Sequence, residues 1–479
     1  MNTRLAALAV LTPALVLTAC KVGPNHAAPD AKLPETWHNA LAEGEVAEQP
    51  TQLAQWWTTL GDPTLDSLIE RAVAGNHDLR IAAARLWEAR AQRGVVAADR
   101  LPSVDVNGRY ERSKASGGTG VPFGVTRNKG DDLYQIGFDA SWEIDLWGRV
   151  RRSIEAADAD MAAAEEDRRD VLLALLAEVA VNYVELRSLQ ERLAIAESNV
   201  ASQKETYDLS KGRADAGIDT GLDVARAEAQ LTSTRAQVPS LAAQVRATMH
   251  RLAVLTGEQP GALEGELASA ASLPVKPASV PVGLPSDLLR RRPDIRRAER
   301  ELAAATARIG VAKGDLFPRF SLTGSFGFSA NEDENLFESD SKFWSIGPTL
   351  RWPIFDAGRI RRNIEVQNAR QEAALARYEK SILTGLEDVE NALVSYSREQ
   401  ARRRELLASE SAAKQAVELA QALNARGLTD FLSVLDAQRQ LYAIQDARAI
   451  SDRTVLVNLV SLYKALGGEW DQPAAVSAK

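Results

Sequence analysis

The sequence is poor in cysteine, methionine and histidine, the residues that form disulfides and bind soft metals. Its 479 residues include one cysteine, three methionines and four histidines. A single cysteine cannot form an internal disulfide, so packing alone must hold the fold. The histidines are scattered along the chain, and no serine or carboxylate lies in a recognisable nucleophile motif. We therefore expect no bound metal, no dissociable cofactor and no enzymatic activity.

Two further absences narrow the class of protein. After the first twenty residues no stretch of some 18 or more apolar residues occurs, which excludes a membrane-spanning helix. The formal net charge is −8, and the lack of a basic excess argues against nucleic acid as a partner.

The N-terminus has the pattern of a targeting signal. Arg4 precedes an apolar run from Leu5 to Leu17, which ends in Leu17-Thr18-Ala19-Cys20. This ending resembles a bacterial lipobox, in which the cysteine is acylated after the signal is removed. We therefore predict a signal peptide over residues 1–19 and a covalent lipid on Cys20 that anchors the chain in outer-membrane lipid. Lys21 favours the outer membrane by analogy with lipoprotein sorting. An ordinary secretory signal with an incidental thiol is the alternative.

Apolar and polar side chains alternate in four segments, which predicts strands with one apolar and one polar face. The strands are expected at about residues 104–112, 134–146, 319–329 and 343–354. Such strands also build soluble sandwiches, but about ten residues suits a tilted membrane crossing. Four strands cannot close a barrel in lipid, so the chain must oligomerise. Two copies would give eight strands with a filled interior, and three copies would give twelve strands and a pore.

The chain also contains an internal repeat with an offset of roughly 210 residues. For example, Asp78-Leu79-Arg80 recurs as Asp294-Ile295-Arg296. The repeats are predicted at 77–258 and 294–468, separated by a proline-rich linker at 259–293. An N-terminal segment at 20–76 precedes them, and a tail at 469–479 follows.

Each repeat is expected to contain one very long helix followed by a shorter one. The long helices are predicted at about 149–211 and 359–425, and the shorter ones at about 222–255 and 432–466. At 1.5 Å per residue a long helix would reach roughly 90 to 100 Å, which no compact globule accommodates. Apolar residues follow alternating steps of three and four, as in a coiled coil, and alanine-rich flanks permit packing on more than one side. A helical wall and a free-standing coiled coil are the two interpretations.

Motifs along nearly the whole mature chain resemble the outer-membrane factor family of the TolC/OprM type, in particular the lipoprotein branch of RND-type tripartite efflux systems. The motifs are Cys20, Trp56-Trp57, Asn76-x-Asp78-Leu79, the segment Leu284 to Ile295, and the segment Gly427 to Ala437. The resemblance implies a mostly α fold with a transmembrane β part. A homotrimer would form a 12-stranded β-barrel, continued by a 12-helix periplasmic α-barrel tunnel whose equatorial region the N-terminal segment wraps.

The same resemblance implies a conduit that catalyses nothing. It would be the exit duct of a tripartite efflux pump, exporting drugs or other small toxic molecules across the outer membrane. Its partners would be a periplasmic adaptor protein and an inner-membrane RND-type transporter. A lipid-anchored periplasmic coiled-coil scaffold or adhesin, and a duct for metal export or type I protein secretion, are the alternatives. Three methionines in the whole chain argue weakly against soft-metal export.

The resemblance also implies a gate at the periplasmic tip. Asp436 matches an aspartate that lines the aperture, Leu432 lies one helical turn before it, and Asp223 matches an aspartate that ties neighbouring hairpins together. Carboxylates gathered on a symmetry axis repel, raise one another's pKa and attract cations. The positions of the gate tyrosine and arginine of TolC hold Asn424 and Thr429, so Arg426 is the candidate partner for the acids.

Two clusters of charge carry further expectations. The expected polar strand faces hold more acids than bases, which predicts a modest cation preference; the residues are Asp105, Glu111, Asp139, Glu143 and Asp145 against Arg109, Arg319 and Arg351. The run Arg290-Arg291-Arg292 is either paired with carboxylates and solvent or a binding site.

Overall fold

The computed structural model describes residues 21–31, 33–39, 55–114, 131–218, 220–271 and 282–468. The predicted signal peptide, Cys20, part of the proline-rich linker and the C-terminal tail lie outside the described residues. The chain divides into two compact units. The sheet unit comprises Met1–Pro29, Leu86–Ala164 and Ala298–Tyr378, and the helical unit comprises Asp30–Arg85, Glu165–Arg297 and Glu379–Lys479.

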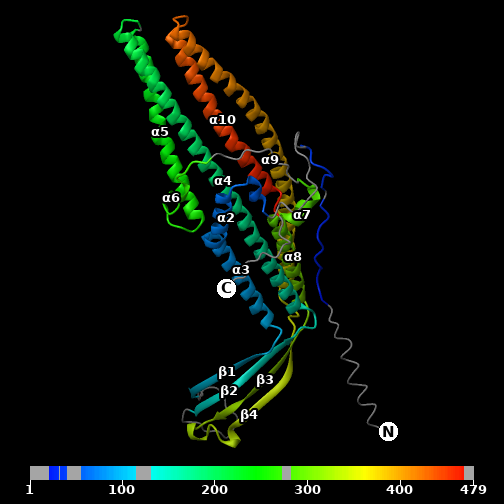
Figure 1. Ribbon diagram of the computed structural model, residues 1–479. Helices are drawn as coiled ribbons and strands as arrows, with labels where there is room; N and C mark the ends of the chain where they lie inside the picture. The colour runs from blue at the N-terminus through cyan, green and yellow to red at the C-terminus, as the bar shows by residue number, and fades with distance from the viewer. Residues whose placement is uncertain are drawn as a thin grey trace. The chain divides into compact units, whose positions relative to one another are not determined.

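Helices dominate the chain, with one small sheet (Figure 1). In chain order the elements are η2 (Trp56–Leu60), α2 (Pro63–Gly75), α3 (His77–Ala98), β1 (Ser103–Ser113), β2 (Asp131–Ile144), α4 (Arg149–Asp215), α5 (Gly221–Leu255), α6 (Glu264–Leu267), η3 (Pro285–Asp287), α7 (Leu288–Arg291), α8 (Pro293–Gly314), β3 (Arg319–Ala330), η4 (Asp333–Asn335), η5 (Ser339–Ser341), β4 (Lys342–Arg351), α9 (Arg359–Ala425) and α10 (Phe431–Ala465). None of the helices described is long and apolar enough to cross a membrane.

The sheet is antiparallel with strand order β1-β2-β3-β4. In the two rows described next, its register sets apolar residues opposite apolar ones and polar residues opposite polar ones. One row across all four strands is apolar, namely Val106, Phe138, Phe326 and Trp344. These four side chains are exposed in the single chain, Trp344 by 74%. The neighbouring row on the other face is polar, namely Asp105, Asp139, Ser325 and Ser345. The alternation expected from the sequence therefore gives one continuous apolar face and one polar face.

Two strands end earlier than the sequence pattern suggested. β2 ends at Ile144 rather than at residue 146, because the Leu146 N–H turns back to the Ile144 carbonyl and Gly148 has a φ of +78°. β4 ends at Arg351 rather than at residue 354, because Trp352 precedes Pro353, which has no N–H for a ladder bond. Apolar alternation continues past both points, so periodicity alone placed these ends too late.

α4 and α9 are continuous helices of 67 residues each, and each turns into a 35-residue helix, α5 or α10 (Figure 1). α4 runs to Asp215, a turn beyond the predicted end. Gly217 and Gly427 follow the long helices with φ of +75° and +71°. After each glycine an N–H reaches back to a carbonyl five residues earlier, Ile218 to Arg213 and Leu428 to Leu423. This is the glycine C-terminal cap that the turn positions predicted.

The core of the helical unit is built from α2, α4, α5, α9 and α10. On α4, the coiled-coil positions Val179, Leu186 and Ala196 are fully buried. Trp56 is 1% exposed and stacks on Tyr463 of α10, with ring centroids 5.4 Å apart. The first tryptophan of the Trp56-Trp57 pair is thus a packing residue, while Trp57 contacts it edge-on at 5.9 Å and is half-buried.

Candidate functional site

The hairpin turns of the helical unit carry the predicted gate residues, and equivalent caps begin α5 and α10. Thr220 caps α5, and Asp223 completes a capping box: the Asp223 N–H donates to the Thr220 hydroxyl at 3.3 Å, and its carboxylate accepts from the Thr220 N–H at 3.2 Å. Asp430 caps α10 and accepts from the Ser433 N–H at 3.0 Å and from its hydroxyl at 2.5 Å. In the first repeat the cap is a threonine and an aspartate follows three residues later, whereas in the second repeat the cap is an aspartate and a serine follows three residues later.

Within one chain, Asp223 and Asp430 therefore serve to cap the starts of α5 and α10. Hydrogen bonds from Ser433 hold the pKa of Asp430 below its usual range. Asp223, which the resemblance assigns to the gate, caps the start of its own helix and lies 3.9 Å from Arg226. Its contact with a neighbouring hairpin remains a prediction.

Leu432 and Asp436 lie four residues apart on one exposed face of α10. The neighbouring face, one residue around the helix, is the packed one, where Phe431 and Leu435 are buried against Ala227. Leu432 is 40% exposed, and the Asp436 carboxylate pairs with Arg439 at 3.0 Å. A single chain therefore presents a leucine and an acid together, without using either in its core.

Arg426 is not the ion-pair partner of Asp436 within the chain, because the Asp436 carboxylate pairs with Arg439, one turn along α10. Arg426 itself is exposed in the turn. Asn424 and Thr429, which the resemblance sets at the gate positions of TolC, contact each other, since the Asn424 amide donates to the Thr429 carbonyl at 3.1 Å. They stabilise the turn rather than leaving a gap in it.

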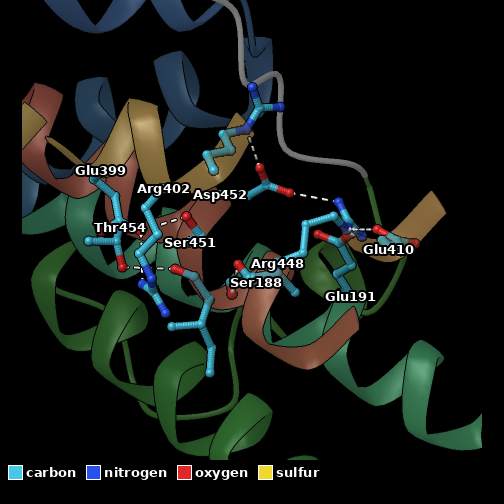
Figure 2. A network of polar contacts seen from close by, with 12 residues as sticks. Ser188, Glu191, Glu399, Arg402, Glu410, Arg448, Ser451, Asp452 and Thr454 are labelled. Carbon is cyan, nitrogen blue, oxygen red and sulfur yellow. Dashed lines mark hydrogen bonds and ion pairs between the residues drawn. The ribbon is translucent and has the colours of Figure 1, made fainter. Parts of the chain in front are cut away.

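Farther along α10, away from the turns, an ion network joins α10 to α4 and α9 (Figure 2). Arg448 of α10 reaches Glu191 of α4 at 2.5 Å, Glu410 of α9 at 2.8 Å and Asp452 of its own helix at 2.7 Å. Asp452 is 3% exposed and also accepts from Arg403 of α9 at 2.5 Å. Burial opposes the charge on Arg448, but its hydrogen bond to Glu191 and the neighbouring acids outweigh burial and raise its pKa.

Sequence reasoning missed this network. The available signal was a pair of charges four residues apart, Arg448 and Asp452, on a helix face that continues as Val455 and Leu459. A charged pair in line with core positions indicates buried partners from another helix. Neighbouring pairs extend the connection, as where Arg192 of α4 meets Asp446 of α10 at 2.6 Å.

The arginine run at 290–292 is paired with carboxylates. The Arg290 side chain is 82% exposed and contacts Asp287 at 3.0 Å. Arg292, by contrast, is 10% exposed and donates to Asp294 at 3.0 and 2.7 Å, to Asp388 of α9 at 2.9 Å, and to the carbonyl of Ala465, the last residue of α10, at 3.1 Å. Burial would lower the pKa of Arg292, but the two carboxylates raise it. The residue joins three helices.

The polar face of the sheet concentrates acids on its first two strands. Asp105 lies directly opposite Asp139, and the Asn107 amide donates to Asp139 at 2.6 Å. On the next two strands the same row carries hydroxyls, with Ser325 and Ser345 in contact at 2.8 Å. Like charges placed directly opposite each other across strands repel, so Asp105 and Asp139 concentrate negative charge on this face.

Comparison with known proteins gives the family. A model of the family described as outer membrane efflux protein matches residues 68–258 and 284–468. The chain belongs to this family. Nodulation protein T of Rhizobium leguminosarum bv. trifolii is 33% identical, with 96% of this chain and 97% of that protein covered. Solvent efflux pump outer membrane protein SrpC of Pseudomonas putida is 34% identical, covering 95% and 97%. The solved outer-membrane channel OprN is 39% identical with a TM-score of 0.84, covering 94% of this chain and all of that one.

As an outer membrane efflux protein, the chain is an outer-membrane component of an efflux system and a transport duct rather than an enzyme. The mostly helical fold with four antiparallel strands is the fold of the family's channels. Among the described residues, no three histidine, cysteine, aspartate or glutamate side chains form a group that could hold a metal ion.

Proposed function

We propose that this outer membrane efflux protein is the exit duct of a tripartite pump. Three copies form a 12-stranded barrel and a 12-helix periplasmic tunnel, which a periplasmic adaptor connects to an inner-membrane RND-type transporter. The cargo is drugs or other small toxic molecules, and the similarity to SrpC, the outer membrane protein of a solvent efflux pump, supports this class. In that assembly the repeats at 77–258 and 294–468 supply the strands and tunnel helices, while residues 20–76 and the linker at 259–293 lie at the equator.

The observation that carries the proposal is the sheet. Its apolar face is exposed across all four strands, and β1 and β4 are open edges. Unpaired strand edges are not tolerated in lipid, so β1 of one copy must pair with β4 of the next. Three such pairings close twelve strands with the polar rows inward, wide enough for an aqueous pore.

We further propose that Cys20 carries the lipid anchor and that the tip of the helical hairpins is the gate. Leu432 and Asp436 face the axis at the aperture, Asp223 contacts the neighbouring hairpin, and Arg426 is the partner offered to these acids by an adjacent copy. The exposure of Leu432 and Asp436 on one face of α10 supports this arrangement.

Planar-bilayer recording tests the gate. The double variant Leu432→Ala/Asp436→Ala should raise single-channel conductance, because it removes the apolar constriction and the acidic ring together. A matched control, Leu209→Ala/Asp208→Ala, removes an exposed leucine and an exposed acid of α4 and should leave conductance unchanged. Equal conductance of the gate variant and the wild type would refute the gate assignment.

The wild-type channel itself tests the duct. We expect heat-modifiable mobility of a trimer on gels, and reversal potentials that show a modest cation preference. Deleting the gene should sensitise the host to drugs and solvents. Sensitivity to copper alone would favour metal export, and loss of a secreted protein would favour type I secretion. A soluble monomer without conductance would instead support a coiled-coil scaffold.

A further inference from the structure

The first described residues of the chain are held tightly against the sheet unit. We call Lys21–His26 the strap. The Val22 N–H donates to the Trp147 carbonyl at 3.1 Å. Arg152 of α4 donates back, to the Val22 carbonyl at 3.0 Å and to the Gly23 carbonyl at 3.1 Å. Trp147 lies between β2 and α4, so the strap is attached where strands meet helices.

Three hydrogen bonds of the Arg152 guanidinium go to the strap. Its side chain is 0% exposed, and besides the two strap carbonyls it donates to the Asn25 side chain at 2.8 Å. Its remaining nitrogen pairs with Glu155 at 2.9 Å, and Glu155 also contacts the Lys21 ammonium. A buried charge is retained only when its donors are satisfied, and here the strap supplies three of the acceptors.

Three glycines shape a cradle around the strap. A Cβ on Gly23, which has a φ of +94°, would lie 2.5 Å from the Gly310 Cα of α8. A Cβ on Gly310 would lie 2.8 Å from the Arg152 side chain, and one on Gly148 would lie 3.1 Å from the Lys21 Cα. Any side chain at these positions would displace the strap or the arginine that holds it.

We propose that Arg152 and this cradle are a docking site for the chain's own mature N-terminus, which fixes the acylated residue beside the strand–helix junctions of the sheet unit. The inference rests on the proposed lipidation of Cys20. Lys21 is the next residue, so a docked strap leaves the lipid one residue, ~3.8 Å of chain, from the cradle. The acyl chains then enter the bilayer alongside the sheet.

Docking also protects the anchor. A protease must take an extended backbone into its own active site, but the N–H and carbonyl of Val22 are already bonded within the fold. The Lys21–Val22 peptide bond should therefore resist trypsin while the strap is docked. Lys21 and Lys32 are the only tryptic sites between Cys20 and Arg71, so a Lys32→Gln parent makes Lys21 the sole site in that stretch.

The experiment labels full-length protein with palmitate in a host that processes lipoproteins and follows release of the label by trypsin. Arg152→Ala and Gly310→Ala in the Lys32→Gln parent should release it at least tenfold faster than the parent. Gly310 is inside α8, where alanine favours the helix, so this variant loosens the strap without weakening the element that carries it. Gly94→Ala is the matched control, a glycine inside α3 with open space at its Cβ, and it should release label at the parent's rate.

If Gly310→Ala melts like the parent and both test variants keep the label as the parent does, the docking site is refuted. Should Arg152→Ala fail to fold, Gly310→Ala decides. A parent that takes up no palmitate refutes lipidation alone. In that case the mass of the trypsin-treated chain still reports cleavage after Lys21, so the strap is judged separately.

Discussion

Replacing Arg292 by alanine should destabilise the helical unit more than any change at the neighbouring arginines. The guanidinium is 10% exposed and connects Asp294 at the start of α8, Asp388 of α9 and the last carbonyl of α10. Alanine would leave two carboxylates and the end of α10 without their shared donor. Gly467 packs directly against Arg292, since a Cβ at that glycine would lie 2.8 Å from the Arg292 Cγ.

The size of the effect follows from burial. Removing one partner of a buried ion pair costs about 3–5 kcal/mol. Asp388 is 47% exposed, so solvent weakens that contact, and we take the lower end, about 3 kcal/mol. Unfolding entropy is roughly 2.1 cal/mol/K per residue, which for 479 residues is about 1 kcal/mol/K. Arg292→Ala should therefore lower the melting temperature by about 3 °C, and Arg292→Lys, which keeps the charge but loses the planar fork, by about half as much.

Circular dichroism at 222 nm, recorded at one heating rate for every variant, measures the shift. Arg290→Ala is the control, since that side chain is 82% exposed and contacts Asp287 alone among the described side chains. It should melt with the wild type. A melting temperature for Arg292→Ala within 1 °C of the wild type, or an equal loss in Arg290→Ala, would refute the reasoning.

Two further predictions concern pH. Burial, and then the charge of Asp294, raise the pKa of Asp170, so its charged form costs stability at neutral pH. Asp170→Asn should raise the melting temperature at pH 7, with a gain that vanishes below the usual pKa of 3.8; a loss at pH 7 would contradict this. Burial, and then a 2.5 Å hydrogen bond to Asp62, raise the pKa of Tyr183 to about 12. The interactions of the neutral Tyr183 hydroxyl stabilise the fold fully below pH 10, and this stabilisation is lost as the pH rises toward 12. The melting temperature of Tyr183→Phe should therefore fall less steeply than that of the wild type between pH 10 and pH 12.

Features that depend on a few neighbouring residues were predictable. The two faces of β2 were visible as alternation in the sequence, and Gly217 and Gly427 marked turns because only glycine adopts a positive φ at little cost. The strand ends were less accurate, since Leu146 and Trp352 continue the alternation after the ladder has ended. Asp223 was assigned to the gate by resemblance, and its capping box with Thr220 became visible only in the structure.

Contacts between distant residues were not predictable. Arg192 and Asp446 are 254 residues apart, and Arg152 binds a strap about 130 residues away. Nothing in the local pattern of either arginine distinguishes it from the exposed Arg290. An ion pair of this kind depends on the rotation and register of two packed helices, which no single window of sequence contains.

The amino-acid sequence by itself determined which segments are strands and helices, which face of each strand is apolar, where the hairpins turn, and to which family the motifs point. These properties depend on a residue's near neighbours, through periodicity, capping and the conformational freedom of glycine. Tertiary structure alone decided that Arg292 and Arg448 join three helices each, and that Arg152 is buried beneath the N-terminal strap. A long charged side chain is stable in water, so whether it is buried depends on how remote elements pack around it.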